Sequence, residues 1–183
     1  MIACAVDNFG RLDVLFNNAG IGAPGYRPIT ETPTSEWEAV LRVNLLAAAA
    51  FARIVGGALV AGGRGGRIVN VSSIAAQAGL PNIGPYNATK AALDAMSRTQ
   101  AVELGPHAIC CNSISPGTIA TELVDELLAA NPPLREKFVN KTALGRVGVT
   151  DEAAWPIVFL LTDAAAFITG ETILVDGGRM ASA

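Results

Sequence analysis

The stretch RIVNVSSIAAQAGLPNIGPYNATK, residues 67–90, decides how this chain folds. Residues 67–71 predict a short buried strand, because three of the five are β-branched and apolar and a glycine-rich segment precedes them. Ser72 and Ser73 follow where that strand should end. Open α/β folds place their ligands at the carboxyl ends of strands, so these two hydroxyls mark a candidate site.

A helix is expected after the loop of residues 74–85, which carries two glycines and two prolines. The sequence YNATKAALDAMSRTQAVEL, residues 86–104, has helical spacing and no internal breaker. Tyr86 and Lys90 are four residues apart, so one helical turn places both side chains on the same face near the start of the helix.

Composition limits the class of protein. The 183 residues suffice for one domain with a single core, expected over residues 1–183, and 51% hydrophobic with 16% charged residues is typical of a globular chain. Every long apolar run is interrupted and no signal peptide is evident, so we expect a cytoplasmic protein without a membrane span. A net charge of -3 gives no electrostatic reason to expect nucleic acid or an anionic membrane as partner. Cys4, Cys110 and Cys111 fit neither a disulfide framework nor a metal-ligand spacing, and we expect no metal.

Predicted strands and helices alternate along the chain. We expect strands at residues 12–16, 67–71, 108–114 and 171–175, and helices at residues 1–9, 36–60, 86–104 and 151–163. This order predicts parallel strands in right-handed βαβ units, with helices on both faces of one sheet. Thr34 or Ser35 is the expected N-cap of the second helix, and Pro156 should disturb the fourth. Residues 122–144 hold short amphipathic pieces broken by prolines, which is typical of a mobile cover.

Three short motifs each carry two interpretations. NNAG, residues 17–20, is an ordinary strand-to-loop turn or a place where a ligand lies against the backbone. Asn44, inside an apolar helix, is a satisfied structural amide or part of a site. SPGTIAT, residues 115–121, is a plain Pro-Gly turn or a wall for a flat ligand.

In order and together, these motifs resemble the short-chain dehydrogenase/reductase family. The match consists of NNAG, Asn44, Ser73, the YNATK of residues 86–90, PGTIAT, and the VDGG of residues 175–178. It covers the chain from end to end, and six ordered features are far more specific than a YxxxK pair alone. The resemblance implies an α/β fold with a Rossmann-like doubly wound parallel sheet. It also implies an NAD(P)-dependent oxidoreductase that interconverts a secondary alcohol and a ketone by hydride transfer.

The resemblance assigns a catalytic role to four side chains. Tyr86 matches the acid/base that exchanges a proton with the substrate oxygen, and Ser73 matches the hydroxyl that holds this oxygen. A free phenol has a pKa of about 10, so neutral-pH chemistry calls for a shift of about three units. Lys90 should favour the phenolate by its charge and also bind the nicotinamide ribose. Asn44 matches the amide that holds a water in the proton path behind the lysine.

The same resemblance implies NAD or NADP as the cofactor, and the sequence indicates no preference between the two. It also implies which residues contact the cofactor. Asn18, Ala19 and Gly20 match the wall of the adenosine-side ribose, and Tyr86 and Lys90 belong to the nicotinamide side. Ile119 and Thr121 match contacts to the nicotinamide carboxamide, and Pro116 and Gly117 complete the expected cofactor contacts.

The front of the family pattern has no counterpart here. The family's TGxxxGxG phosphate turn is absent, and the first strand found matches the family's fourth, so we expect the first three strands to be missing. The glycines of residues 62–66 precede a strand instead of linking a strand to a helix, and are read as a flexible surface loop. The strand at residues 12–16 should then be an exposed apolar edge.

Two other functions compete with the enzyme. The chain could be a non-catalytic fragment that acts only as an assembly partner, since the alanine-rich helices 36–60 and 86–104 suit a homo-oligomer such as a dimer or tetramer. A weaker alternative is an extended relative that modifies nucleotide sugars and shares the YxxxK pair. The closing VDGG and the short chain argue against that alternative.

Overall fold

Four parallel strands form the central sheet of this protein, whose computed structural model describes residues 2–181. Their order across the sheet is β1-β2-β3-β6, and each neighbouring pair is parallel. The strands are β1 (Val14–Asn17), β2 (Gly66–Val71), β3 (Ile109–Pro116) and β6 (Thr172–Val175). The four predicted strands are thus confirmed, with β3 continuing to Pro116, two residues beyond the expected end. A separate two-stranded piece pairs β4 (Ile119–Ala120) with β5 (Gly148–Val149).

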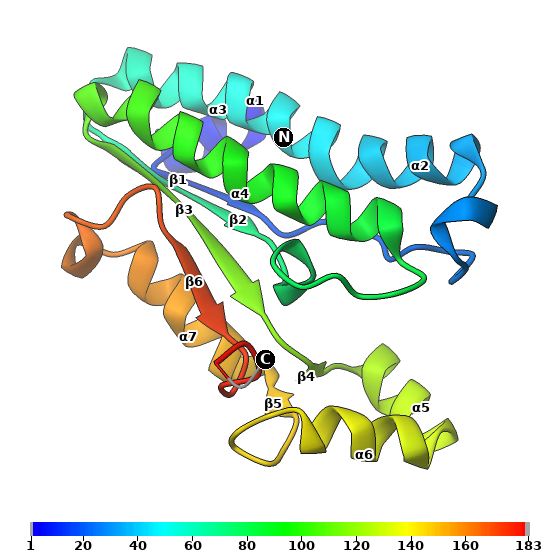
Figure 1. The fold of residues 1–183 in the computed structure, drawn as a ribbon. Coiled ribbons are helices and arrows are strands. Elements are labelled where there is room, and N and C mark those ends of the chain that lie inside the picture. The colour runs from blue at the N-terminus through cyan, green and yellow to red at the C-terminus, as the bar shows by residue number, and fades with distance from the viewer. Residues whose placement is uncertain (1, 182–183) are drawn as a thin grey trace.

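Helices cover both faces of the sheet, as expected (Figure 1). On one face lie α4 (Gly84–Leu104) and a continuous helix made of α2 (Thr34–Leu41), the π-helical turn η2 (Arg42–Leu46) and α3 (Ala47–Gly62). On the other lies α7 (Thr150–Leu160). The shorter elements are α1 (Ile2–Phe9), α5 (Glu122–Ala130), α6 (Pro132–Asn140) and the 3-10 turns η1 (Ile29–Glu31), η3 (Ile74–Ala76), η4 (Gly105–His107) and η5 (Asp163–Ala165).

Each face of the sheet has its own apolar cluster. Under α3 and α4, six buried residues pack together: Val55, Leu59, Ile68, Ala101, Ile109 and Cys111. Under α7, the buried cluster is Val69, Ile114, Leu160 and Ala165. Successive residues of a strand point to opposite faces, which is why Ile68 and Val69 of β2 belong to different clusters. The two clusters fix the sheet between its helices and hold its carboxyl edge in place.

The helix from Thr34 to Gly62 is long and apolar enough to cross a membrane by length and composition alone. In this fold it lies along the sheet and α4, and contributes Val55 and Leu59 to the core, as a core helix of a globular domain does. Its N-cap is Pro33, without a side-chain cap, so the prediction of Thr34 or Ser35 was wrong by one position. Proline is favoured at helix starts because its missing N–H is not needed there.

Other local predictions met mixed outcomes. Gly10 has a φ of 73° and ends α1 at the expected place. Residues 62–66 form the turn from α3 into β2, and Gly63 and Gly65 adopt left-handed backbone angles. Helix α7 continues through Pro156 without being broken. The cover predicted at residues 122–144 consists of α5 and α6, which lie beyond the carboxyl end of β3 (Figure 1).

Candidate active site

A cavity of about 330 Å³ opens at the carboxyl ends of β1, β2 and β3. Because all four strands are parallel, the segments that follow them meet at the same edge of the sheet. Seven of the predicted site residues line this cavity: Asn18, Gly20, Ser73, Tyr86, Lys90, Pro116 and Gly117. Residues far apart in the sequence are therefore brought together where the motifs predicted a ligand.

Lys90 lies at the inner end of the cavity with a side chain that is only 4% exposed. Its Nζ donates a 2.7 Å hydrogen bond to the carbonyl of Val71 at the end of β2. The same nitrogen lies 5.5 Å from the centroid of the Tyr86 ring, one helical turn earlier on α4. Burial lowers the pKa of Lys90 to about 8, and the negative charge of Asp94 opposes this shift. Near neutral pH the lysine is an ammonium beneath the tyrosine.

Tyr86 is a partly buried phenol whose pKa is raised, not lowered. Burial is the largest cause, and a side-chain hydrogen bond with Ser73 acts in the opposite direction. The expectation that the charge of Lys90 brings this pKa toward neutrality is thus wrong for the chain by itself. The physical reason is that the lysine donates to the Val71 carbonyl, while the phenol loses its hydration. In this state Tyr86 holds its proton and is suited to act as an acid.

The two serines after β2 have separate roles. Ser73 is the N-cap of η3, where its Oγ accepts a 3.2 Å hydrogen bond from the Ala75 amide. Ser72 is 2% exposed, and its Oγ donates 3.1 Å to the carbonyl of Lys90. Ser72 therefore fixes helix α4 against β2, and Ser73 is the hydroxyl that interacts with Tyr86. This division agrees with the choice of Ser73 from the sequence.

Asn44 lies behind the cavity in the π-helical turn η2, and it is 1% exposed. Its Oδ1 accepts from the Ile21 amide at 2.8 Å, and its Nδ2 donates to the Ile21 carbonyl at 2.9 Å. A π turn within an α-helix often marks a functional position, because the extra residue re-aims a side chain. Here the amide holds the segment that follows the NNAG motif against the site.

A third contact joins Asn44 to helix α4. Its Nδ2 also lies 3.3 Å from Oγ1 of Thr89, which is fully buried and donates 2.9 Å to the carbonyl of Tyr86. Asn44, Thr89 and Tyr86 thus form a continuous hydrogen-bonded path from η2 to the start of α4. Thr89 was not predicted as a site residue, because a threonine in a helix has many ordinary roles.

Two glycines allow close approach at the cavity wall. A β-carbon on Gly20 would lie 3.3 Å from Asn44 Oδ1 and 3.5 Å from Lys90 Nζ. A β-carbon on Gly117 would lie 2.8 Å from the Cα atom of Asp176. Any side chain at Gly20 would occupy space next to the lysine, and one at Gly117 would push apart the segments after β3 and β6.

Besides Asn44, three predicted residues lie outside the cavity. Ala19 lines a neighbouring cavity beside β1, Ile119 lines a smaller one of about 170 Å³ near Asp176, and the exposed Thr121 is the N-cap of α5. Asn18 lines both the site and the cavity beside β1. Seven of the predicted residues therefore line the cavity itself, and Ala19, Ile119 and Thr121 lie elsewhere.

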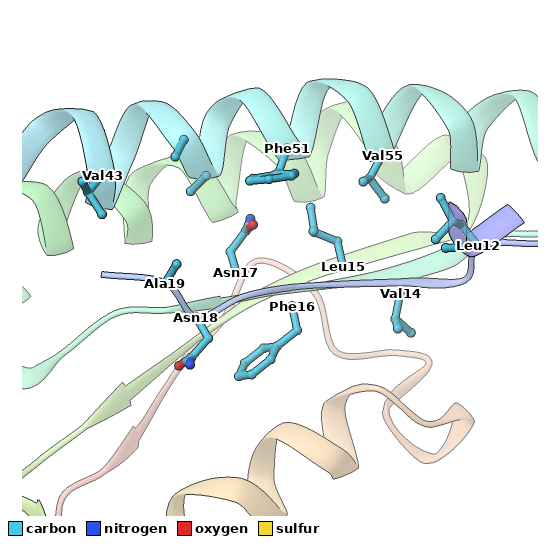
Figure 2. A pocket seen from close by; sticks show the side chains of 13 residues that line it. Leu12, Val14, Leu15, Phe16, Asn17, Asn18, Ala19, Val43, Phe51 and Val55 are labelled. Atoms are coloured by element: carbon cyan, nitrogen blue, oxygen red, sulfur yellow. The ribbon is translucent and has the colours of Figure 1, made fainter. Parts of the chain in front are cut away.

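The cavity beside β1 is apolar and holds about 380 Å³. Figure 2 shows Leu15 and Asn17 pointing from β1 toward Phe51 and Val55 of α3, with Val43 nearby. On the opposite face of β1, Val14 and Phe16 are 43% and 42% exposed. Among residues 2–181, β1 pairs only with β2, so its other side is an open edge, as predicted.

Within the described residues, no group of three or more histidine, cysteine, aspartate or glutamate side chains is placed to hold a metal ion. Cys4 is exposed, whereas Cys110 and Cys111 are buried and all three are free thiols.

Comparisons with known proteins give matches along almost the whole chain. A family model described as enoyl-(acyl carrier protein) reductase matches residues 1–179. An L-rhamnose 1-dehydrogenase (NAD(P)(+)) of a Sphingomonas species is 41% identical over 97% of this chain and 68% of its own length. Bovine L-xylulose reductase is 36% identical over 97% of this chain and 72% of its own length. A gluconate 5-dehydrogenase from Burkholderia cenocepacia, solved with NADP and tartrate, has a TM-score of 0.92 and 30% identity, over 100% of this chain and 70% of that one.

Proposed function

Because this chain belongs to the short-chain dehydrogenase/reductase family, and so to the oxidoreductases that use NAD or NADP, we propose that it interconverts a secondary alcohol and a ketone. The proposed catalytic set is Ser73, Tyr86, Lys90 and Asn44. One observation carries the proposal: three of these side chains line a single cavity at the carboxyl edge of the sheet, with the fourth hydrogen-bonded directly behind it.

The cavity fits the nicotinamide end of a dinucleotide. Gly20 leaves open the space beside Lys90 that a side chain would fill, and Pro116 and Gly117 form the facing wall. Lys90 and Tyr86 would hold the nicotinamide ribose, and Asn18, Ala19 and Gly20 the adenosine-side ribose. Pro116, Gly117, Ile119 and Thr121 would lie on the carboxamide side. An oxidised nicotinamide, when bound, accepts a hydride from the alcohol carbon and brings a positive charge that favours the phenolate.

The chain's own side chains would handle the proton. In the reduction direction, Tyr86 would donate its proton to the substrate oxygen while the Ser73 hydroxyl holds that oxygen in place. Lys90, charged near neutral pH, would stabilise the phenolate that remains. Asn44 would fix the Ile21 segment and, through Thr89, the first turn of α4, and would hold a water in the path behind Lys90.

The phosphate side of the cofactor is not supplied by the described residues. Within residues 2–181, the glycines at 62–66 lead from a helix into a strand, the reverse of a phosphate-binding turn. We propose that the four strands form the later part of the doubly wound order, with the first three strands lying outside these residues. The open edge and apolar cavity beside β1 support this placement, as does coverage of 68% of the length of the rhamnose dehydrogenase.

A second candidate function is a non-catalytic assembly partner within the same family. The observation that favours it is apolar exposure on the helical face, where Ile54 of α3 is 46% exposed and Val102 of α4 is 78% exposed. A homo-oligomer formed through these helices would survive without cofactor. A cytoplasmic location fits either function.

The two functions separate in a paired measurement. Fluorescence titrations with NADH and NADPH measure cofactor binding. The ketone-dependent loss of the absorbance of the reduced nicotinamide measures turnover. Light scattering gives the molar mass of the chain in solution. Tyr86→Phe should lower turnover by roughly 100- to 10,000-fold, the usual contribution of general acid catalysis, and leave binding in place. Tyr26→Phe is the matched control, since Tyr26 is the other tyrosine and is 65% exposed. An oligomer that binds neither cofactor would favour the assembly partner.

A further inference from the structure

Asp94 is a buried carboxylate beside the proposed catalytic lysine. It lies four residues after Lys90 on α4 and is 6% exposed. Its Oδ1 accepts no hydrogen bond from any residue that the structure describes. Buried charged groups are normally paired, so a carboxylate left in this state calls for an explanation. The four-residue spacing places it on the same helix face as Lys90.

The surroundings of Asp94 are hydroxyls from the sheet. Burial raises the pKa of Asp94, and the side chains of Ser72, Ser113 and Thr172 counter part of this rise. Ser72 also donates its hydroxyl to the carbonyl of Lys90, which ties the aspartate's neighbour to the lysine's backbone. A hydroxyl just after β2 and hydroxyls of β3 and β6 thus act on the turn of α4 that follows Lys90.

Lys90 has few other groups that favour its charge. Its Nζ donates to the carbonyl of Val71, and burial lowers its pKa to about 8. Among the described residues, the charge of Asp94 is what opposes this lowering. Of the other titratable groups, Tyr86 faces the lysine and Arg98 acts on Asp94.

The other elements packed against α4 include α2 and η2, whose charged residues are Glu36, which pairs with Arg27, and Glu38 and Arg42. The segment between β2 and η3 presents hydroxyls, the end of β2 presents the Val71 carbonyl, and the segment after β1 presents Gly20. Asp94 is the charged group that acts on Lys90.

We propose that Asp94 is a positioning residue whose negative charge holds Lys90 in its ammonium form beneath Tyr86. Its meaning for catalysis rests on the proposed function of Lys90, whereas the charge coupling is a property of the folded chain. Asp94 touches neither substrate nor cofactor and acts through the lysine. The four-residue spacing places the carboxylate on the helix face of Lys90, while Nζ of the lysine donates to the Val71 carbonyl and lies 3.5 Å from where a β-carbon on Gly20 would be.

The test is a titration of Lys90 that needs no cofactor and no activity. The chain has three lysines, Lys90, Lys137 and Lys141, so biosynthetic ¹³C-lysine gives a simple NMR spectrum in which a Lys90→Arg variant identifies the Lys90 signal. Asp94→Asn should move the Lys90 midpoint down by about one pH unit, as expected when an opposite charge nearby is removed. Lys137 and Lys141 are exposed and serve as internal references.

Two further variants separate charge from packing. Asp94→Glu keeps the negative charge, so the Lys90 titration midpoint should stay within about 0.3 pH unit of the parent value. Asp94→Ser is a second neutral variant, for use if Asp94→Asn disturbs the fold. It should lower the Lys90 midpoint by the same amount as Asp94→Asn. A Lys90 midpoint unchanged in both neutral variants would overturn the proposal. If Asp94→Glu shifts the Lys90 midpoint as much as the neutral variants do, the proposal is also overturned, because a change in packing would then explain the shift. Absent turnover would count against the proposed function alone, since this titration reads the lysine directly.

Discussion

At the scale of single residues, burial acts against the charge of Lys90, and this has a consequence for stability. The pKa of Lys90 falls from 10.5 in the unfolded chain to about 8 in the fold. Between these values the unfolded chain binds more protons, so the free energy of unfolding rises with pH. We expect a gain of about 1 kcal/mol between pH 8 and 9 from this one group.

The rise in the free energy of unfolding should end near pH 9, because other groups make the free energy of unfolding fall above that pH. The pKa of Cys111 is raised from 9.0 to about 12 and that of Tyr86 is raised from 10.0, so both remove stability as the pH climbs further. Urea unfolding at pH 8 and pH 9 measures the gain, and Lys90→Met should abolish the Lys90 share. If the methionine variant gains as much as the parent, the slope has another origin.

Asn44 is expected to stabilise the fold as well as the site. Asn44→Ala would leave both the amide and the carbonyl of Ile21 without their partner, and would break the link to Thr89. Buried polar groups left unsatisfied cost about 1–3 kcal/mol, so we expect a loss of roughly 2–3 kcal/mol in urea unfolding. Asn140→Ala, at the exposed end of α6, is the control and should change stability by less than about 0.5 kcal/mol. Equal losses in the two variants would contradict the role given to Asn44.

Much of the site was predictable at this scale, and the exceptions have physical reasons. The spacing of Tyr86 and Lys90 and the position of Ser73 at a strand end follow from local periodicity, and the structure brings them together. The direction of the Tyr86 pKa shift does not follow, because it depends on burial by segments distant in the sequence. Asp94 could have been noticed from its four-residue spacing to Lys90, whereas its burial could not.

At the scale of elements, the ends of β3 and β6 depend on a contact that only glycine permits. A β-carbon on Gly117 would lie 2.8 Å from the backbone of Asp176, which cannot move as a flexible side chain would. Gly117→Ala should therefore cost about 1–3 kcal/mol through overpacking and distort the cavity wall. Gly79→Ala is the matched control, since a β-carbon there meets nothing within 4 Å. A thermal melt of both variants checks this, and similar melting temperatures would refute the close contact.

The elements themselves were predicted where periodicity was strong and missed where tertiary contacts decide. The four strands of the sheet lie within a few residues of their predicted positions because buried parallel strands read as short apolar runs. The β4–β5 pair has two residues per strand, too short to leave a pattern. The π turn around Asn44 was not foreseen, because its sequence, RVNLL, is compatible with an ordinary helix.

At the scale of the whole molecule, the sheet has an open edge at β1. The sheet is covered on both faces, yet its β1 edge is open among residues 2–181 and next to an apolar cavity of about 380 Å³. The candidate site lies at the carboxyl ends of β1, β2 and β3, and Asn18 and Gly20 bring it next to the open edge of β1.

The open edge makes a prediction about association. An exposed apolar edge strand is a template for pairing with another chain, and a charge placed on it opposes such pairing. Phe16→Lys, on β1, should lower the concentration-dependent increase in light scattering without altering the circular dichroism spectrum. Phe167→Lys is the control, because Phe167 is fully exposed but lies outside the strands of the sheet. If Phe167→Lys suppresses association and Phe16→Lys does not, the chains meet through a different surface. If only Phe16→Lys suppresses the increase in light scattering, the chains associate through the exposed apolar side of β1.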